Sequence, residues 1–180
     1  MVVALLLVVG ANAANETPIR SVDIRQDSDG YVADVVMFVP VPAGTAWEVL
    51  TDFDHMAAWV PNVRESRIIA HDGNTVTVEQ QGVAKFGIAN FPYSSVRQMQ
   101  LDPQRTVHST QIKGSMRRLE SVVTLLPEGG GTQLTYHLEM IPAGLAAAVL
   151  STDFLKHELT EQFGAIIEEM RRRDRQARPK

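Results

Sequence analysis

The segment His157-Glu158-Leu159-Thr160-Glu161 is the first place to look for metal or acid–base chemistry. On a helix, residues four apart share a face, so His157 and Glu161 could hold one ion between them. The zinc-protease motif requires a second histidine where this chain has Glu161. A third ligand and a water-activating group are not evident, so we expect a solvated helix turn and no metal.

Other reaction motifs are absent or incomplete. The chain has no cysteine, which excludes disulfides, thiolate metal sites and a cysteine nucleophile. It has no G-x-S-x-G sequence, and the triple glycine at 129–131 lacks the Lys-Ser/Thr of a phosphate-binding loop. Arg97, Arg117 and Arg118 could meet an anionic head group or an enolate, although exposed strand positions would also explain them. The sequence thus identifies no catalytic residue and no cofactor.

A set of aromatic and methionine side chains could line an apolar binding site, because such side chains adapt to irregular ligands. Ordinary core packing is the alternative for each one. The candidates for ligand contact are Phe53, Trp59, Phe86, Phe91, Tyr93, Met99, Tyr136, Met140, Phe154 and Phe163. Residues 86–93 (FGIANFPY) combine three aromatics with a glycine and a proline. This composition favours a connection between strands, either a flexible lip over a pocket mouth or a packed loop.

Length and charge restrict the class of protein. A chain of 180 residues fits one domain with a substantial core. Its net charge is −4, but residues 1–170 carry 11 basic and 20 acidic side chains, a net charge of −9. So acidic a body would repel a phosphate backbone, and we expect no nucleic-acid partner. The basic segment 174–180 could make transient contact with an anionic membrane surface, or be a solvated helix end.

The N-terminus is typical of a targeting segment. Residues 2–9 (VVALLLVV) are apolar and too few to cross a bilayer, and Ala11-Asn12-Ala13 follows as a cleavage-site pattern. We therefore predict a signal peptide over 1–13, a linker over 14–19 and a periplasmic or secreted protein. No basic residue precedes the apolar run, and a buried N-terminal strand is the alternative.

Hydrophobic periodicity predicts the elements that would position the candidate residues. Short helices are expected at 43–51 and 53–60, and a long amphipathic helix from 145 to about 173. The apolar stripe of the long helix consists of Leu155, Leu159, Phe163, Ile166 and Met170. Its other faces are expected to carry Glu158, Glu161, Glu168 and Glu169. Turn sequences separate β-type runs, which indicates an antiparallel meander. The runs are 21–26, 31–39, 65–70, 75–81, 94–101, 106–113, 118–126 and 132–141.

These elements would form one α+β domain over residues 20–173. A twisted antiparallel sheet of about seven strands can wrap around a single long helix. One helix cannot fill the whole concave side of such a sheet. The uncovered part is then either packed by large side chains or left as a cavity.

Three stretches resemble a known family. Residues 38–54 (FVPVPAGTAWEVLTDFD) with 59–67 (WVPNVRESR), and later 119–136, are similar to the polyketide cyclase/dehydrase and coenzyme Q-binding branch of the START-like helix-grip (SRPBCC) superfamily. The resemblance covers roughly residues 31–172. It implies a helix-grip fold and a hydrophobic ligand cavity between the sheet and the long helix. It transfers no catalytic motif.

The sequence leaves three functions open. The first is a protein that binds and carries or sequesters a small hydrophobic ligand, such as a lipid, a quinone or a polyketide-like molecule, without catalysis. The second is a cyclase or dehydratase acting on such a ligand, which requires an ionisable group in the cavity. The third is an interaction module whose interior is fully packed, which requires that no such void exists.

Overall fold

A computed structural model describes residues 18–180, except 87–88, 145–146, 148–149 and 179–180. The predicted signal peptide 1–13 and most of the predicted linker lie outside the described residues, so export stays a prediction. The elements are β1 (Ile19–Gln26), β2 (Tyr31–Val39), α1 (Ala43–Leu50), the 3₁₀ helix η1 (Phe53–Ala58), β3 (Val63–Asp72), β4 (Thr75–Phe86), β5 (Ala89–Asp102), β6 (Thr106–Gly114), β7 (Met116–Glu128), β8 (Gly131–Pro142) and α3 (Thr152–Ala177).

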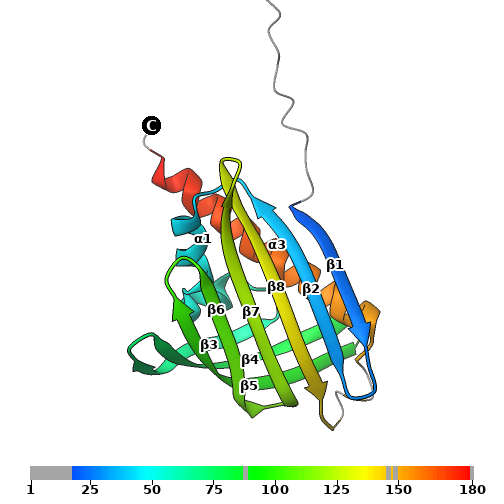
Figure 1. The fold of residues 1–180 in the computed structure, drawn as a ribbon. Coiled ribbons are helices and arrows are strands. Elements are labelled where there is room, and N and C mark those ends of the chain that lie inside the picture. The colour runs from blue at the N-terminus through cyan, green and yellow to red at the C-terminus, as the bar shows by residue number, and fades with distance from the viewer. Residues whose placement is uncertain (1–17, 87–88, 145–146, 148–149, 179–180) are drawn as a thin grey trace, which may run out of the picture.

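The strands form one antiparallel sheet in the order β1-β2-β8-β7-β6-β5-β4-β3. The six strands from β3 to β8 follow one another as a meander, and β2 closes against β8. Figure 1 shows the sheet curving around α3, which crosses its concave side. The predicted α+β helix-grip fold is confirmed, with eight strands where about seven were expected.

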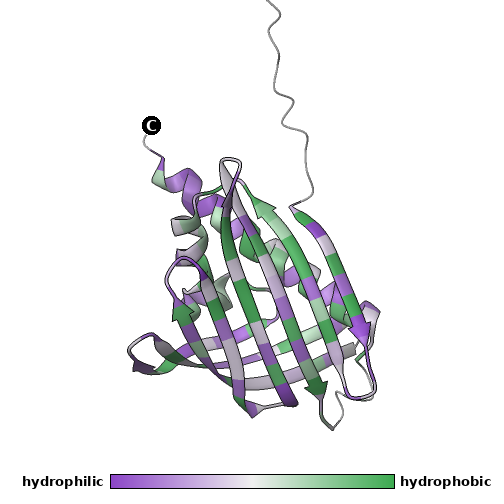
Figure 2. Ribbon diagram, in the orientation of Figure 1, coloured by the Kyte–Doolittle hydropathy of each residue, from purple (hydrophilic) through white to green (hydrophobic). Residues whose placement is uncertain are grey.

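Strict alternation of apolar and polar residues determines which side of each strand is buried. In β2 every second side chain from Tyr31 to Val39 is buried, and in β8 Leu134, Leu138 and Met140 lie on the buried face. Because neighbouring side chains of a strand point to opposite faces, this pattern also fixes the pairing register. Figure 2 shows the alternation as changing colour along β7 and β8.

The long helix begins later than its periodicity predicts. Ser151 has an extended backbone, and its hydroxyl accepts a hydrogen bond from the Phe154 N–H (3.1 Å), so α3 starts at Thr152 and not at residue 145. A serine in this position satisfies an amide that the first turn leaves free, which stabilises a helix start there. The predicted apolar stripe is otherwise confirmed, since Leu155, Leu159, Phe163 and Met170 are buried and Ile166 is partly buried against the same core.

Residues 86–93 were expected to form a connection, but of the described residues Phe86 ends β4 and 89–93 belong to β5, while 87–88 lie outside the description. The two strands pair as far as Phe86 and Ala89, with Ala84 paired to Phe91 and Lys85 to Asn90. The pairing of β5 with β6 begins only at Ser95. Pro92 therefore sits where β5 has β4 but not β6 beside it, and a strand with a free edge tolerates the missing N–H of a proline.

An ionic cluster ties the α1–η1 corner to the C-terminal half of α3. The Arg173 guanidinium donates to Asp52 (2.5 Å) and to Glu169 (2.7 Å), and Glu169 is only 6% exposed. Asp52 also pairs with Nδ1 of His55. These contacts hold the short helices over one end of the concave face, where α1 lies beside the C-terminal end of α3 (Figure 1).

Three other arginines near the end of α3 are paired as well. Arg171 bonds to Glu168, Arg172 to Glu169 and Arg178 to Asp174. Contact of the basic tail with a membrane surface stays a prediction. Among the helices in the described ranges, none is both long enough and apolar enough to cross a bilayer.

Replacing the central cation of the cluster tests whether it fixes the helices. Arg173→Met leaves Asp52 without its arginine partner, and we expect the free energy of unfolding to fall by about 1–2 kcal/mol. Arg171→Met, which removes an exposed pair with Glu168, is the matched control and should change it little. Urea denaturation measures both. Equal losses in the two variants would contradict this role.

Candidate functional site

A cavity of about 370 Å³ lies between the concave face of the sheet, η1 and the first half of α3. Its walls come from both core clusters, one built on β2, β8 and α3, the other on Phe53, Val76, Val78, Met99 and Val107. A water molecule occupies about 30 Å³ in the liquid, so the space exceeds several waters. The hypothesis of a fully packed interior is therefore wrong.

Most of the residues expected to contact a ligand line this cavity. They are Phe53, Phe91, Tyr93, Met99, Tyr136, Met140, Phe154 and Phe163. Trp59 instead borders a separate surface hollow next to Pro61 and Arg64. The backbone of Phe86 ends β4, but its side chain is outside what the structure describes. Contact of any of these residues with a ligand stays a prediction.

Two aromatic pairs join the sheet to α3 across the cavity wall. The Phe91 ring on β5 meets Phe154 edge to face, with centroids 5.5 Å apart and planes at 90°. The Tyr136 ring on β8 meets Phe163 at 4.9 Å and 64°. Such geometries are favourable for aromatic quadrupoles. They place four of the expected residues as contacts between layers as well as cavity lining.

Arg97 is a cation in this largely apolar space. It lies on the inner face of β5 and donates from Nη2 to Oε1 of Gln80 (2.6 Å). Its Nε is shielded from solvent and has no hydrogen-bond partner in the described part of the protein. Burial lowers the pKa of Arg97, opposed by Tyr136 and Tyr93, but a guanidinium remains charged at neutral pH. Arg117 and Arg118, the other arginines considered, are exposed.

A chain of hydrogen bonds holds Arg97 in place. Gln80, which is 5% exposed, accepts from Arg97 and donates from Nε2 to Ser66 Oγ (3.1 Å). Ser66 donates in turn to the backbone oxygen of Phe53 (2.5 Å). The chain runs from β5 through β4 and β3 to η1, so the position of the guanidinium depends on four elements.

Glu158 on α3 is a buried carboxylate at the same cavity. It is 5% exposed and accepts hydrogen bonds from Asn62 Nδ2 (2.6 Å) and the backbone N–H of Lys85 (3.2 Å). Burial raises its pKa above the ordinary value, and the bonds from Asn62 and Lys85 oppose that effect. Glu158 thereby links α3 to β4 and to the turn before β3.

Two tyrosines complete the polar part of the lining. Burial raises the pKa of Tyr93 to about 12, with Arg97 lowering it and Glu158 raising it, so this hydroxyl senses both charges. It donates to the backbone oxygen of Asn62 (3.3 Å). Burial also raises the pKa of Tyr136, against a hydrogen bond with Ser121. Both phenols are therefore neutral near pH 7.

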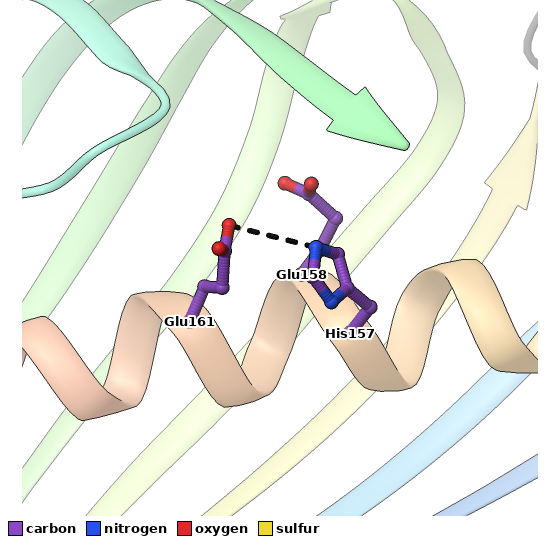
Figure 3. Close-up of side chains that lie close together, drawn as sticks. All are labelled: His157, Glu158 and Glu161. Atoms are coloured by element: carbon purple, nitrogen blue, oxygen red, sulfur yellow. Dashed lines mark ion pairs between the residues drawn. The ribbon is translucent and has the colours of Figure 1, made fainter. Parts of the chain in front are cut away.

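His157, Glu158 and Glu161 lie close together, but they make contacts with different partners. Its potential ligand atoms lie within 4.8 Å of one another (Figure 3). His157 Nε2 and Glu161 pair at 3.7 Å on the exposed side, whereas Glu158 already accepts bonds from Asn62 and Lys85. The residues fit an exposed ion pair beside a buried carboxylate, and we assign them no metal.

Glu158 was the main residue missed by the sequence analysis, which placed it on a polar face of the helix. It lies three residues after Leu155 and one before Leu159, both of which are buried. Residues three and four apart share a face of a helix, so its membership of the apolar stripe was detectable. The buried Gln80 and Ser109 gave no comparable signal in their strands.

The raised pKa of Glu158 predicts a pH-dependent stability difference. A carboxyl whose folded pKa exceeds its unfolded pKa contributes stability at low pH, and loses it as the pH rises through the folded pKa. Glu158→Gln removes this titration. As the pH rises from acidic to neutral, the free energy of unfolding of this variant should therefore increase relative to that of the wild type. Urea denaturation across pH measures the difference, with Glu161→Gln as an exposed control. A difference that moves the other way would show that the ionised form is the favoured one.

Comparison with solved structures shows similar folds at low sequence identity. The protein TTHA0849 from Thermus thermophilus matches with a TM-score of 0.68 and 14% identity, over 79% of this chain and 98% of that one. The ZhuI aromatase/cyclase from a Streptomyces species (R1128) gives 0.63 and 18%, over 84% and 96%. The STAR-related lipid transfer protein from Xanthomonas axonopodis gives 0.65 and 15%, over 83% and 98%.

A search of curated proteins gives no match. A family model does match, over residues 32–173, which include the sheet from β2 onward and nearly all of α3. The matched range contains every wall of the cavity, including Arg97 and Glu158. The chain therefore belongs to the family described as polyketide cyclase / dehydrase and lipid transport.

Proposed function

We propose that this protein binds and carries or sequesters a small hydrophobic ligand, such as a lipid, a quinone or a polyketide-like molecule, in the cavity beneath α3. The observation that carries the proposal is a cavity of about 370 Å³ with mostly apolar walls, the usual form of a small-molecule site. The family description and the lipid transfer neighbour support the same class of ligand.

Binding would be driven by removing apolar surface from water, at about 25 cal/mol per Å² buried. The aromatic and methionine side chains would supply most of this contact, including Met99 and Met140 on the sheet. Methionine fills irregular gaps, so this lining suits ligands of varied outline.

Ligand exchange would occur where the end of β4, near Lys85, and the start of β5, near Phe91, meet α3. Residues 89–93 pair with β4 but not with β6, and a two-stranded ribbon has little stability of its own. The Phe91–Phe154 ring contact and the bond from the Lys85 N–H to Glu158 hold it against the helix. Separating these contacts would open the cavity with the rest of the sheet intact.

Filling the cavity tests the proposal. Val123 on β7 lines the cavity, whereas Val122 belongs to the opposite face of the same strand. Val123→Phe should weaken binding of the neutral apolar dye Nile red by about tenfold or more, because the ring takes up ligand space. Val122→Phe should retain wild-type affinity. Dye fluorescence titration measures both, and absence of dye binding to the wild type would contradict the proposal.

A cyclase or dehydratase is the second candidate, because the cavity holds an acid–base group and a cation together. Glu158 could take a proton from a carbon next to a ketone, while Arg97 stabilises the enolate oxygen that forms. Both residues line the cavity, and Tyr93 senses both charges. The aromatase/cyclase among the structural neighbours supports this candidate through its fold alone.

Proton exchange on a simple ketone tests turnover without knowledge of the natural substrate. An enzyme of this kind should accelerate deuterium incorporation into 4-phenylbutan-2-one in D₂O, followed by NMR. Glu158→Gln should lower that rate about a hundredfold or more, while Glu161→Gln leaves it unchanged. A wild-type protein that binds the ketone without accelerating exchange would leave binding as the function.

A further inference from the structure

The outer edge of β4 changes partner at Gly82. β3 pairs with β4 only as far as this residue, and none of the described strands lies along the edge beyond it. Backbone amides there still need acceptors. The Val83 N–H donates to the backbone oxygen of Asn62 (2.9 Å), and the Lys85 N–H donates to Glu158 (3.2 Å). Asn62 and Glu158 thus take the place of a neighbouring strand.

The two substitutes for the strand also bond to each other. Asn62 Nδ2 donates to Oε2 of Glu158 (2.6 Å), while the Lys85 N–H uses the other oxygen, Oε1. The carboxylate therefore joins three segments, namely α3, the end of β4 and the turn before β3. We refer to Asn62, Glu158 and the Lys85 N–H as the clasp. Hydrogen bonds to a charged group are stronger than neutral ones, so few atoms hold these segments together.

The clasp is a thin part of the cavity wall. Asn62 and Glu158 line the cavity and are 6% and 5% exposed. Their chain neighbours Pro61 and His157 are exposed, and so is the side chain of Lys85. A single layer of side chains therefore separates the cavity from solvent at this point.

Gly82 allows the clasp to form because it has no side chain. A Cβ at this position would collide with the backbone oxygen of Asn62 and with the Tyr93 hydroxyl. These two groups meet over the glycine, where the Tyr93 hydroxyl donates to the Asn62 oxygen (3.3 Å). Any larger residue would displace the Asn62 backbone, and with it the side-chain amide that reaches Glu158.

We propose that Gly82 positions the clasp, and that the clasp sets the rate at which ligand enters and leaves the cavity. The proposal rests on the proposed binding function and specifies how exchange at that site is controlled. With the clasp formed, α3, the end of β4 and the turn before β3 stay together and the cavity is closed. Exchange requires the bond from Asn62 to Glu158 to break, so the open form is a minor state.

Control of this kind has a kinetic signature. The clasp bonds lie within the protein, so they act equally on the empty and the occupied form. Weakening them increases the open population of both forms, which raises the association and dissociation rate constants by the same factor and leaves Kd unchanged. Loss of ligand contacts, by comparison, changes mainly the dissociation rate constant and weakens binding.

Stopped-flow fluorescence with Nile red measures both rate constants. Gly82→Ala should raise each of them about tenfold or more, because a hydrogen bond to a charged group contributes a factor of this size to an equilibrium. Gly164→Ala on α3 is the matched control, since a Cβ there meets no atom of a neighbouring element within 4 Å. It should leave both rate constants at their wild-type values.

A second variant removes the clasp bond without adding a group to β4. Asn62→Ala deletes the amide that reaches Glu158 and should raise both rate constants by a similar factor. Asn74→Ala, in the exposed β3–β4 turn, is its control and should change neither. Circular dichroism shows whether each variant is folded, and for an unfolded Gly82→Ala the Asn62→Ala variant decides.

The outcomes separate the clasp from the proposed function. Failure of the wild type to bind the dye would overturn the binding function together with the clasp. A wild type that binds, with Asn62→Ala rates unchanged or only its dissociation faster, would overturn the clasp and leave binding intact. Faster exchange in Asn62→Ala but not in a folded Gly82→Ala would overturn the role of Gly82.

Discussion

The structure depends on a mismatch of area between a large curved sheet and a single helix. Eight strands curl around α3, and the helix with the α1–η1 corner covers only part of the concave face. The apolar residues therefore gather in two clusters, one along β2, β8 and α3 and the other beneath η1. Protein interiors are otherwise close-packed, so a void of about 370 Å³ at the junction is a property of this architecture and not a local defect.

The same mismatch explains where polar groups are tolerated. A guanidinium in a packed core would need a carboxylate beside it, but Arg97 borders the cavity and, within the described part of the chain, bonds to the neutral Gln80. Glu158 occupies the opposite situation, because Asn62 and the Lys85 backbone fix its oxygens where the helix meets the sheet. One charge thus has both oxygens bonded by the protein, and the other has its Nε without a partner among the described residues.

The sequence predicted the parts of the fold that repeat. β-type runs between turn sequences located every strand, and the spacing of Leu155, Leu159 and Phe163 located the buried face of α3. Prediction failed where a specific contact, a side-chain cap or a strand pairing, outweighed the sequence pattern. The Ser151 cap moved the start of the helix, and pairing with β4 extended β5 through Pro92. The cavity aromatics followed from residue type, whereas Gln80, Ser109 and the role of Glu158 depend on contacts between strands and helix that no local pattern records.

Carriage and turnover make different demands on Glu158. As part of the wall, its carboxylate can keep both hydrogen bonds in the free and the occupied protein, and nothing in the site has to move except at the end of β4 and β5. As a general base, it would have to accept a proton on an oxygen that now bonds to Asn62 or Lys85, which weakens the contact that closes the cavity. Burial has already reduced the free-energy difference between the ionised and the neutral form of Glu158, so the cost of protonating it is moderate. Binding nevertheless uses the site as it stands, while catalysis weakens a contact that closes it, and for this reason we place binding first.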